Sequence, residues 1–273
     1  MRELERELPA TTESATLDAP AASGSLIVVG PGRAGRSIAA AASAAGIGVS
    51  VLGRDDEVPA LDAGSAMVLL CVPDTAIADA CERIAVAVPR GTAVGHASGA
   101  TPLAALASAE ARECPTFSLH PLQTIPAPDT PLAGAPCAVS GSDERVRLRA
   151  HALAAALGMR PFDVPEEGRA AYHAAASMAS NFLIALEESA AELLGAAGVE
   201  NPRDVLAPIV LRTAANWAEA GPDALTGPIA RGDEHVVAAH LDALAERMPE
   251  LAPLYEALAE CTRGIAGRSE GAR

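Results

Sequence analysis

Residues 25–35 read SLIVVGPGRAG, an apolar run that ends at a glycine and continues into a small-residue segment. Gly30, Gly32 and Gly35 form the pattern G-x-G-x-x-G directly after a predicted strand and at the start of a predicted helix. In this setting the first glycine permits a tight turn, the second lets the backbone approach a pyrophosphate, and the third lets helix and strand pack closely. Because a helix N-terminus attracts anions, the stretch predicts a dinucleotide-binding α/β domain.

The predicted cofactor site includes more than the three glycines. Pro31, Arg33 and Ala34 lie between them, and Val72 and Pro73 end a later apolar run that reads as the third strand. Arg33 either assists phosphate binding or is a surface charge at the helix start. Ligands of doubly wound sheets lie beyond the carboxyl ends of the strands, so we expect these positions to line the cofactor.

The residues after the second predicted strand favour NADP over NAD. That strand is expected to end near Leu52, where an NAD site carries an acidic side chain about 20 residues beyond the glycines. Arg54 stands there instead, and a guanidinium binds a 2′-phosphate through two hydrogen bonds. The alternative is that Asp55 and Asp56 hold the ribose and that Arg54 is a solvated charge.

The rest of the chain divides into two regions with different patterns of apolar residues. Apolar runs at 67–72, 91–99, 115–121 and 137–141 predict further strands of a mostly parallel sheet within residues 25–165. From residue 166 to 273 the sequence predicts only helices, at 168–197, 201–220, 233–247 and 251–265. Residues 1–24 are acidic and rich in Ser, Thr and Ala, and are expected to be a disordered tail.

Candidate chemical groups follow the predicted strands of the first domain. His96 and Ser98 follow the fourth strand, and the segment SLHPLQT (118–124) places His120 and Gln123 after the fifth. His120 could polarise or protonate a substrate carbonyl, or be a structural histidine satisfied by backbone groups. Ser98 and Gln123 are candidate substrate ligands.

Two features of the helical part add candidates. His173, Ser177 and Asn181 are spaced by four residues and share one helix face, as a cleft wall or as a packed surface with satisfied hydrogen bonds. In LTGPIARGD (225–233), Asp233 is placed to cap the next helix, and we expect Arg231 to be free to bind a substrate carboxylate.

Composition excludes several classes of function. The 273-residue chain has a formal charge of −15 and 2% aromatic residues, which argues against nucleic-acid binding. All 20 basic residues are arginine, so lysine Schiff bases and lysine acids are excluded. Five cysteines without C-x-x-C spacing indicate neither disulfides nor a metal site, and favour a reducing cytoplasmic setting. No membrane span is predicted.

Together, the segments GPGRAG, LLCVPD, HASGA, SLHPLQT, YHAAASMASN and LTGPIARGD resemble the Rossmann-like oxidoreductases whose C-terminal half is domain of unknown function 2520. The resemblance covers nearly the whole chain after Ser25. It implies a Rossmann NAD(P)-binding domain followed by an all-helical domain of the 6-phosphogluconate dehydrogenase C-terminal type, and a homodimer formed through the helices. Related enzymes include ketopantoate reductases, β-hydroxyacid dehydrogenases and pyrroline-carboxylate reductases, which reduce C=O or C=N bonds with a nicotinamide.

The resemblance also implies roles for individual residues. Ketopantoate reductases and β-hydroxyacid dehydrogenases carry a Lys on the first long helix of the second domain and an Asn four residues later, and Ser177 and Asn181 match this pair. Without the lysine, His120 or His173 must supply the proton. The sequence thus predicts an NADPH-dependent reductase of a small 2-oxo acid, ketopantoate first, held by Arg231. The alternatives are an imine reductase and a regulatory NADP-binding protein without chemistry.

Overall fold

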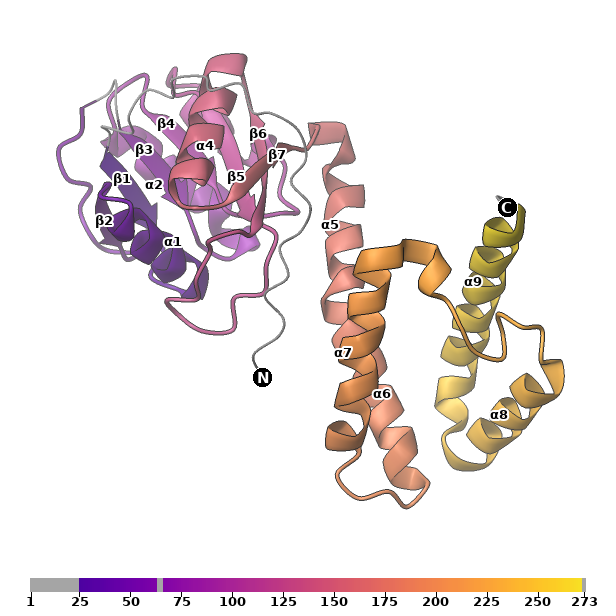
Figure 1. The fold of residues 1–273 in the computed structure, drawn as a ribbon. Helices are drawn as coiled ribbons and strands as arrows, with labels where there is room; N and C mark the ends of the chain where they lie inside the picture. Colours follow the sequence, from indigo (N-terminus) through magenta and orange to yellow (C-terminus); the bar gives the residue numbers. More distant parts are fainter. Residues whose placement is uncertain (1–24, 63–65, 272–273) are drawn as a thin grey trace. The chain divides into compact units, whose positions relative to one another are not determined.

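The computed structural model describes residues 25–62 and 66–271. The chain forms two compact units, and the division between them falls between Ala176 and Ser177 (Figure 1). The predicted tail at 1–24 lies outside the described residues.

The first unit is built on one seven-stranded sheet in the order β2-β1-β3-β4-β5-β6-β7. All neighbouring strands are parallel except β5 and β6. The strands are β1 (Ser25–Val29), β2 (Gly48–Leu52), β3 (Met67–Leu70), β4 (Ala93–His96), β5 (Thr116–Pro121), β6 (Pro136–Gly141) and β7 (Arg160–Asp163). The predicted α/β class with a mostly parallel sheet is therefore confirmed.

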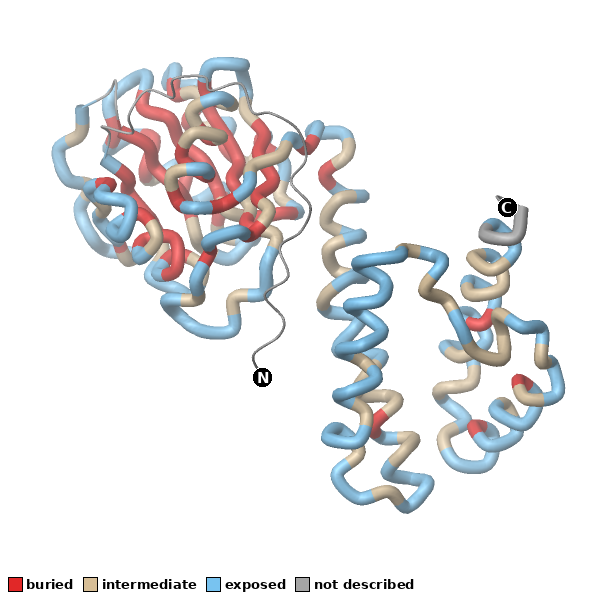
Figure 2. The backbone as a smooth tube through the Cα atoms, in the orientation of Figure 1, coloured by how far each residue is buried: buried red, intermediate tan, exposed pale blue. Residues whose placement is uncertain are grey.

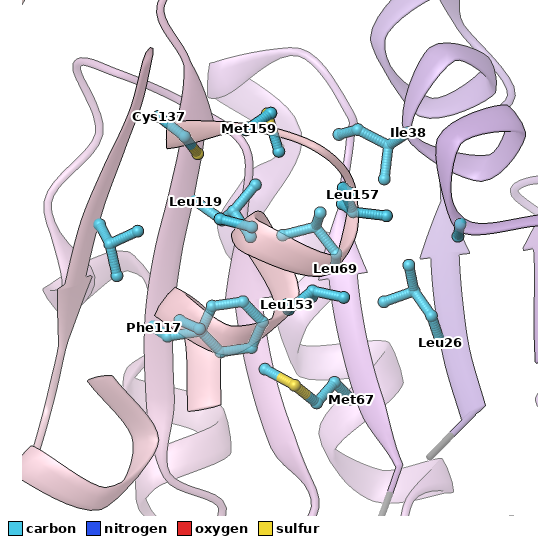
Figure 3. Packing of buried hydrophobic residues seen from close by; sticks show 14 of the residues in the cluster. Leu26, Ile38, Met67, Leu69, Phe117, Leu119, Cys137, Leu153, Leu157 and Met159 are labelled. Carbon is cyan, nitrogen blue, oxygen red and sulfur yellow. The ribbon is translucent and has the colours of Figure 1, made fainter. Parts of the chain in front are cut away.

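Helices cover both faces of this sheet, because successive residues of a buried strand point to opposite faces. One face packs on α1 (Arg33–Ala44) and α4 (Glu144–Ala156), with Leu26 and Phe117 in its core (Figure 3). The other face packs on α2 (Ile77–Ala87) and on the segment formed by η2 (Leu103–Leu106) and α3 (Ala107–Glu110). Short 3-10 turns complete the unit at η1 (Asp74–Ala76) and η3 (Glu166–Gly168).

The edge strand β7 was not predicted from the sequence. It is four residues long, contains Pro161, and is half-buried or exposed along its length. Proline is tolerated in edge strands, where its missing N–H need not pair. No apolar run therefore marks this strand.

The C-terminal part is helical throughout its described residues. Its elements are α5 (Arg169–Ala179), α6 (Asn181–Ala196), α7 (Pro202–Ala220), η4 (Gly221–Ala224), α8 (Glu234–Arg247), η5 (Pro249–Leu251) and α9 (Ala252–Gly271). The prediction of one helix over 168–197 is wrong, because Ser180 leaves helical geometry at φ −128° and ψ −75°. Ser and Asn bond readily to nearby backbone, which weakens a helix where Ser180 and Asn181 adjoin.

The two units differ in how much apolar surface they bury. In the second unit the buried hydrophobic residues are only Ala191, Val237, Leu244 and Ala259 among those described. Figure 2 shows α6 and α7 largely exposed, whereas the strands of the first unit are mainly buried. No helix in the described ranges is long and apolar enough to cross a membrane.

Candidate active site at the carboxyl edge of the sheet

The glycine loop after β1 has the close packing that its spacing predicts. Gly30 has a φ of +112°, and a Cβ there would lie 2.5 Å from the carbonyl oxygen of Cys71. A Cβ on Gly35 would overlap the carbonyl oxygen of Gly30. At Gly32, in contrast, a Cβ would meet no protein atom within 4 Å. Two glycines thus close the turn, and the middle one leaves open space beside the backbone.

The start of α1 fits a dinucleotide pyrophosphate. Gly32 is the N-cap residue and provides no side-chain cap, and the first-turn amides from Arg33 to Gly35 have no acceptor among the described residues. Such amides form an anion site. Pro31 and Ala34 lie in the same turn, and the Pro31 carbonyl accepts a hydrogen bond from Arg36 Nε at 2.9 Å. Arg33 Nη1 donates to the Pro126 carbonyl at 3.3 Å, so its guanidinium contacts a neighbouring loop.

The turn after β2 leaves Arg54 available. Asp56 Oδ2 accepts the backbone N–H of Gly53 at 2.8 Å, so this carboxylate closes the turn. Arg54 and Asp55 are exposed, and Arg54 makes no ion pair with the described residues. The turn borders a surface hollow lined by Leu52, Gly53, Asp56, Glu57, Val58, Arg83, Ile84 and Ala87.

The segment after β3 connects the glycine loop to the centre of the sheet. A Cβ on Gly30 would lie 3.2 Å from Val72 Cγ1, so Val72 borders the glycine loop. Pro73 precedes η1, which begins at Asp74. Asp74 acts electrostatically on both His96 and His120, which places the ends of β3, β4 and β5 in one neighbourhood.

His120 and Tyr172 form a hydrogen-bonded pair at this edge. His120 Nδ1 lies 2.6 Å from the Tyr172 hydroxyl, and the rings meet edge to face with centroids 5.7 Å apart. A Cβ on Gly99 would lie 2.7 Å from His120 Cε1, so the imidazole packs directly on this glycine. The ring of His173 lies 6.4 Å from that of His120. The structure thus brings both predicted proton donors together.

Both members of the pair favour their neutral forms. Burial, followed by the charges of His173 and Arg169, lowers the pKa of His120 to about 4, and the charge of Asp74 opposes this shift. Burial raises the pKa of Tyr172 to about 12. A neutral imidazole against a neutral phenol can hold one proton on either side, so the pair can pass a proton along the hydrogen bond.

Sequence reasoning missed two charged residues beside this pair. Arg169 is 3% exposed and forms an ion pair with Glu166. Tyr172, which directly precedes His173, was not among the predicted site residues. The position of Arg169 three residues before a tyrosine on a helix was the available signal, but an arginine near a helix start is common.

His96 is buried in the sheet. Its side chain is 0% exposed, and among the described residues neither ring nitrogen has a hydrogen-bond partner of good geometry, although the Pro102 backbone is close enough to raise its pKa. Burial, then the charge of Arg169, lowers its pKa to about 4, against opposing effects of Glu166 and Asp74. An unpaired buried polar group is costly to the fold.

We therefore expect acid to destabilise the protein through His96. The unfolded histidine gains a proton below its ordinary pKa of 6.5, whereas the folded one resists until about 4. Stability conferred by the neutral ring is thus present above pH 6.5 and is lost as the pH falls towards 4, by about 2 kcal/mol between pH 7 and pH 5. In thermal denaturation at these two pH values, His96→Phe should lose less stability than the wild type; an equal loss would contradict this origin.

The remaining predicted site residues have local partners or lie in the second unit. Ser98 Oγ accepts the N–H of Ala100 at 3.2 Å and of Thr101 at 3.0 Å, so this hydroxyl stabilises its own turn. Gln123 is exposed, and its amide donates to the Pro131 carbonyl at 2.9 Å.

Ser177, Asn181 and Arg231 belong to the second unit. Asn181 begins α6 after the break at Ser180. The predicted helix face shared by His173, Ser177 and Asn181 is therefore interrupted before Asn181. Arg231 is not free as expected: its Nη2 lies 2.8 Å from Asp233 Oδ2. Asp233 occupies the N-cap position of α8, but its side chain does not cap the helix.

Two family models match parts of the chain. Residues 53–121 match the Rossmann-like domain, and residues 135–262 match the domain of unknown function DUF2520. No curated protein sequence matches the chain.

Solved structures of similar fold are numerous. A candidate NADP oxidoreductase from Bacteroides fragilis is 23% identical with a TM-score of 0.72, covering 90% of this chain and 100% of its own. A reductive aminase from Aspergillus terreus, in complex with NADPH and ethyl-5-oxohexanoate, is 19% identical with a TM-score of 0.61 over 92% and 100%. The pyrroline carboxylate reductase of Plasmodium falciparum with NADP bound is 12% identical with a TM-score of 0.58 over 90% and 100%. This likeness establishes a shared fold.

Proposed function

We propose that the protein is an NADPH-dependent reductase of a small carbonyl compound. The observation that carries this is the neutral His120–Tyr172 pair, 2.6 Å apart, on the sheet edge that also bears an open dinucleotide loop. The similar structures that contain NADP or NADPH support the cofactor. Arg54, without an ion pair among the described residues, supports preference for the 2′-phosphate.

The chain's own groups divide the chemistry as follows. The first-turn amides of α1 and the open face of Gly32 would hold the pyrophosphate, and Arg54 would bind the 2′-phosphate. When bound, NADPH supplies the hydride. Tyr172 would donate its hydroxyl proton to the substrate oxygen. The phenolate would regain a proton from His120 Nδ1 along the hydrogen bond while His120 Nε2 takes up a proton from water, so that the imidazole ends the step neutral. The ring of His173 lies beside them, with its centroid 6.4 Å from that of His120.

A small 2-oxo acid such as ketopantoate is the substrate we propose first. The roles that the sequence predicts for Arg231 toward its carboxylate, and for Ser177 and Asn181 toward its carbonyl, stay predictions. Imine reduction is the second candidate, favoured by the similarity in fold to a reductive aminase and a pyrroline carboxylate reductase. A protein that binds NADP without chemistry is the third proposal.

Replacing the tyrosine separates these functions. Tyr172→Phe should reduce kcat for a 2-oxo acid about 10²-fold, because the general acid is lost. A cyclic iminium ion already carries its proton, so its reduction should change little. NADPH oxidation, followed by absorbance with ketopantoate, other 2-oxo acids and pyrroline carboxylate, tests both.

The matched control is Tyr255→Phe, because Tyr255 makes a similar 2.7 Å hydrogen bond to His240 in the second unit. Equal rates of 2-oxo acid reduction for wild type and Tyr172→Phe would contradict the acid role. Saturable NADPH binding without turnover of any compound would favour the non-catalytic protein.

We also propose that a second copy of the chain covers the helical unit. Eleven large apolar residues of this unit are at least 37% exposed, whereas only four hydrophobic residues among those described are buried in it. Large exposed apolar surfaces mark association sites. The residues are Met178, Phe182, Leu183, Ile184, Leu186, Val205, Ile209, Leu211, Trp217, Leu254 and Leu258.

A further inference from the structure

The guanidinium of Arg169 is fixed by partners from three elements. Its Nη2 donates to Ser118 Oγ on β5 at 2.7 Å and to Ser140 Oγ on β6 at 2.9 Å. Its Nε donates to Glu166 Oε1 at 3.0 Å, and the other oxygen of this carboxylate accepts the N–H of Leu103 at 2.9 Å. Arg169 therefore ties the first turn of α5 to two central strands.

Two hydrogen bonds join α5 to β5 side by side. Arg169 bonds to Ser118, and Tyr172 bonds to His120. Residues three apart share a helix face, and residues two apart share a strand face. The two contacts thus match in spacing, and together they fix both the rotation and the height of the helix over the strand. With one contact alone, the helix could still turn about it.

We propose that Arg169 is a positioning residue, which with Glu166 holds Tyr172 against His120 in the geometry that proton transfer requires. This proposal rests on the reductase function proposed above. Arg169 does not reach the reacting atoms in this account; it acts through the tyrosine.

Energetics support a role beyond stability. Replacing a buried ion pair by apolar residues of similar volume is often neutral or stabilising, so packing alone does not call for an arginine here. The planar guanidinium binds two hydroxyls and a carboxylate through N–H groups whose directions are fixed, which a rotating ammonium group does not provide. The fixed directions of these bonds give the helix one orientation.

The charge of Arg169 also acts on the neighbouring imidazole. The groups facing His120 are Tyr172, His173 and Arg169 from α5 and Asp74 from η1. Arg169 is among those that lower the pKa of His120. Removing the guanidinium should therefore raise this pKa, in addition to loosening the tyrosine.

The test compares Arg169→Met and Arg169→Lys with the wild type. For Arg169→Met we expect kcat for the 2-oxo acid to fall about 10²-fold, the penalty of misplacing a catalytic group. NADPH affinity should stay within about twofold, because the glycine loop does not contact Arg169. The His120 pKa, from NMR titration of its ring, should rise. Arg169→Lys keeps the charge, so that pKa should stay low while kcat recovers only in part.

Arg147→Met is the matched control. Arg147 forms ion pairs with Glu144 and Asp163 at 2.7 Å each. The Arg147→Met variant therefore loses as many ion-pair partners as Arg169→Met or more, at a residue that does not bond to His120 or Tyr172. Its kcat and its His120 titration should equal those of the wild type.

Three results would overturn the proposal. One is a folded Arg169→Met protein with wild-type kcat. Another is a uniform loss of thermal stability and NADPH binding without any change of the His120 titration, which would indicate a purely structural role. If Arg169→Met does not fold, wild-type kcat in Arg169→Lys is the third.

Failure of the reductase function is recognised separately. In that case the wild type reduces none of the compounds. The NMR titrations of His120 in the wild type and variants still show whether Arg169 sets the environment of the pair.

Discussion

A Gly32→Val variant should fold as the wild type does and yet lose NADPH binding by about 10³-fold. In the free protein a Cβ at Gly32 meets nothing within 4 Å, and its φ of −71° and ψ of −175° suit any residue. The added side chain would instead occupy the space we assign to the pyrophosphate. Loss of two charge-assisted hydrogen bonds, at about 1.5–3 kcal/mol each, accounts for an effect of this size.

Gly48→Val is the control for this substitution. Gly48 is exposed at the start of β2, and its Cβ also meets no atom within 4 Å. Its NADPH affinity, measured by fluorescence titration, and its Tm should equal those of the wild type. Gly35→Val should behave differently from both, since its Cβ overlaps the Gly30 carbonyl, and we expect it to lower the Tm as well as binding. Wild-type affinity in a folded Gly32→Val protein would exclude this loop as the cofactor site.

The contrast among these glycines shows what the sequence can predict. The spacing of the glycines and the strand before them predict the turn, the start of the helix and the open face at Gly32. All three depend only on residues that are close in the sequence. The buried β strands were equally visible, because each is a continuous apolar run between turn residues. β7 was not, because its half-exposed residues and Pro161 resemble a loop.

The site was predicted less completely, since it depends on contacts between distant residues. The sequence placed His120 after a strand and His173 on a helix, but the bond between His120 and Tyr172 joins residues 52 positions apart. The buried partner of Ser118 is 51 positions away. The spacing of apolar residues along the sequence does not predict contacts between residues so far apart. Arg231 shows the converse: a charge that seemed free in sequence has a partner two residues away.

An Ile209→Glu variant should convert a two-copy assembly into single chains. Ile209 is 62% exposed on α7, and a symmetric interface contains each substituted position twice. Burial of an isoleucine contributes about 2 kcal/mol, so losing two, with two carboxylates placed against apolar surface, should weaken association at least ~10³-fold. Sedimentation equilibrium over a range of concentrations measures this shift directly.

Val86→Glu provides the comparison at equal exposure. Val86 is 64% exposed on α2 of the sheet unit, and an added carboxylate there changes net charge by the same amount. This variant should remain a two-copy assembly. Phe182→Glu, 62% exposed on α6, should dissociate as Ile209→Glu does, because both belong to the apolar surface of the helical unit. A wild-type protein that sediments as one chain would contradict the proposal, as would dissociation caused equally by Val86→Glu. Loss of helical stability on dissociation is expected too, since the described helices bury too little apolar surface to be stable without a partner.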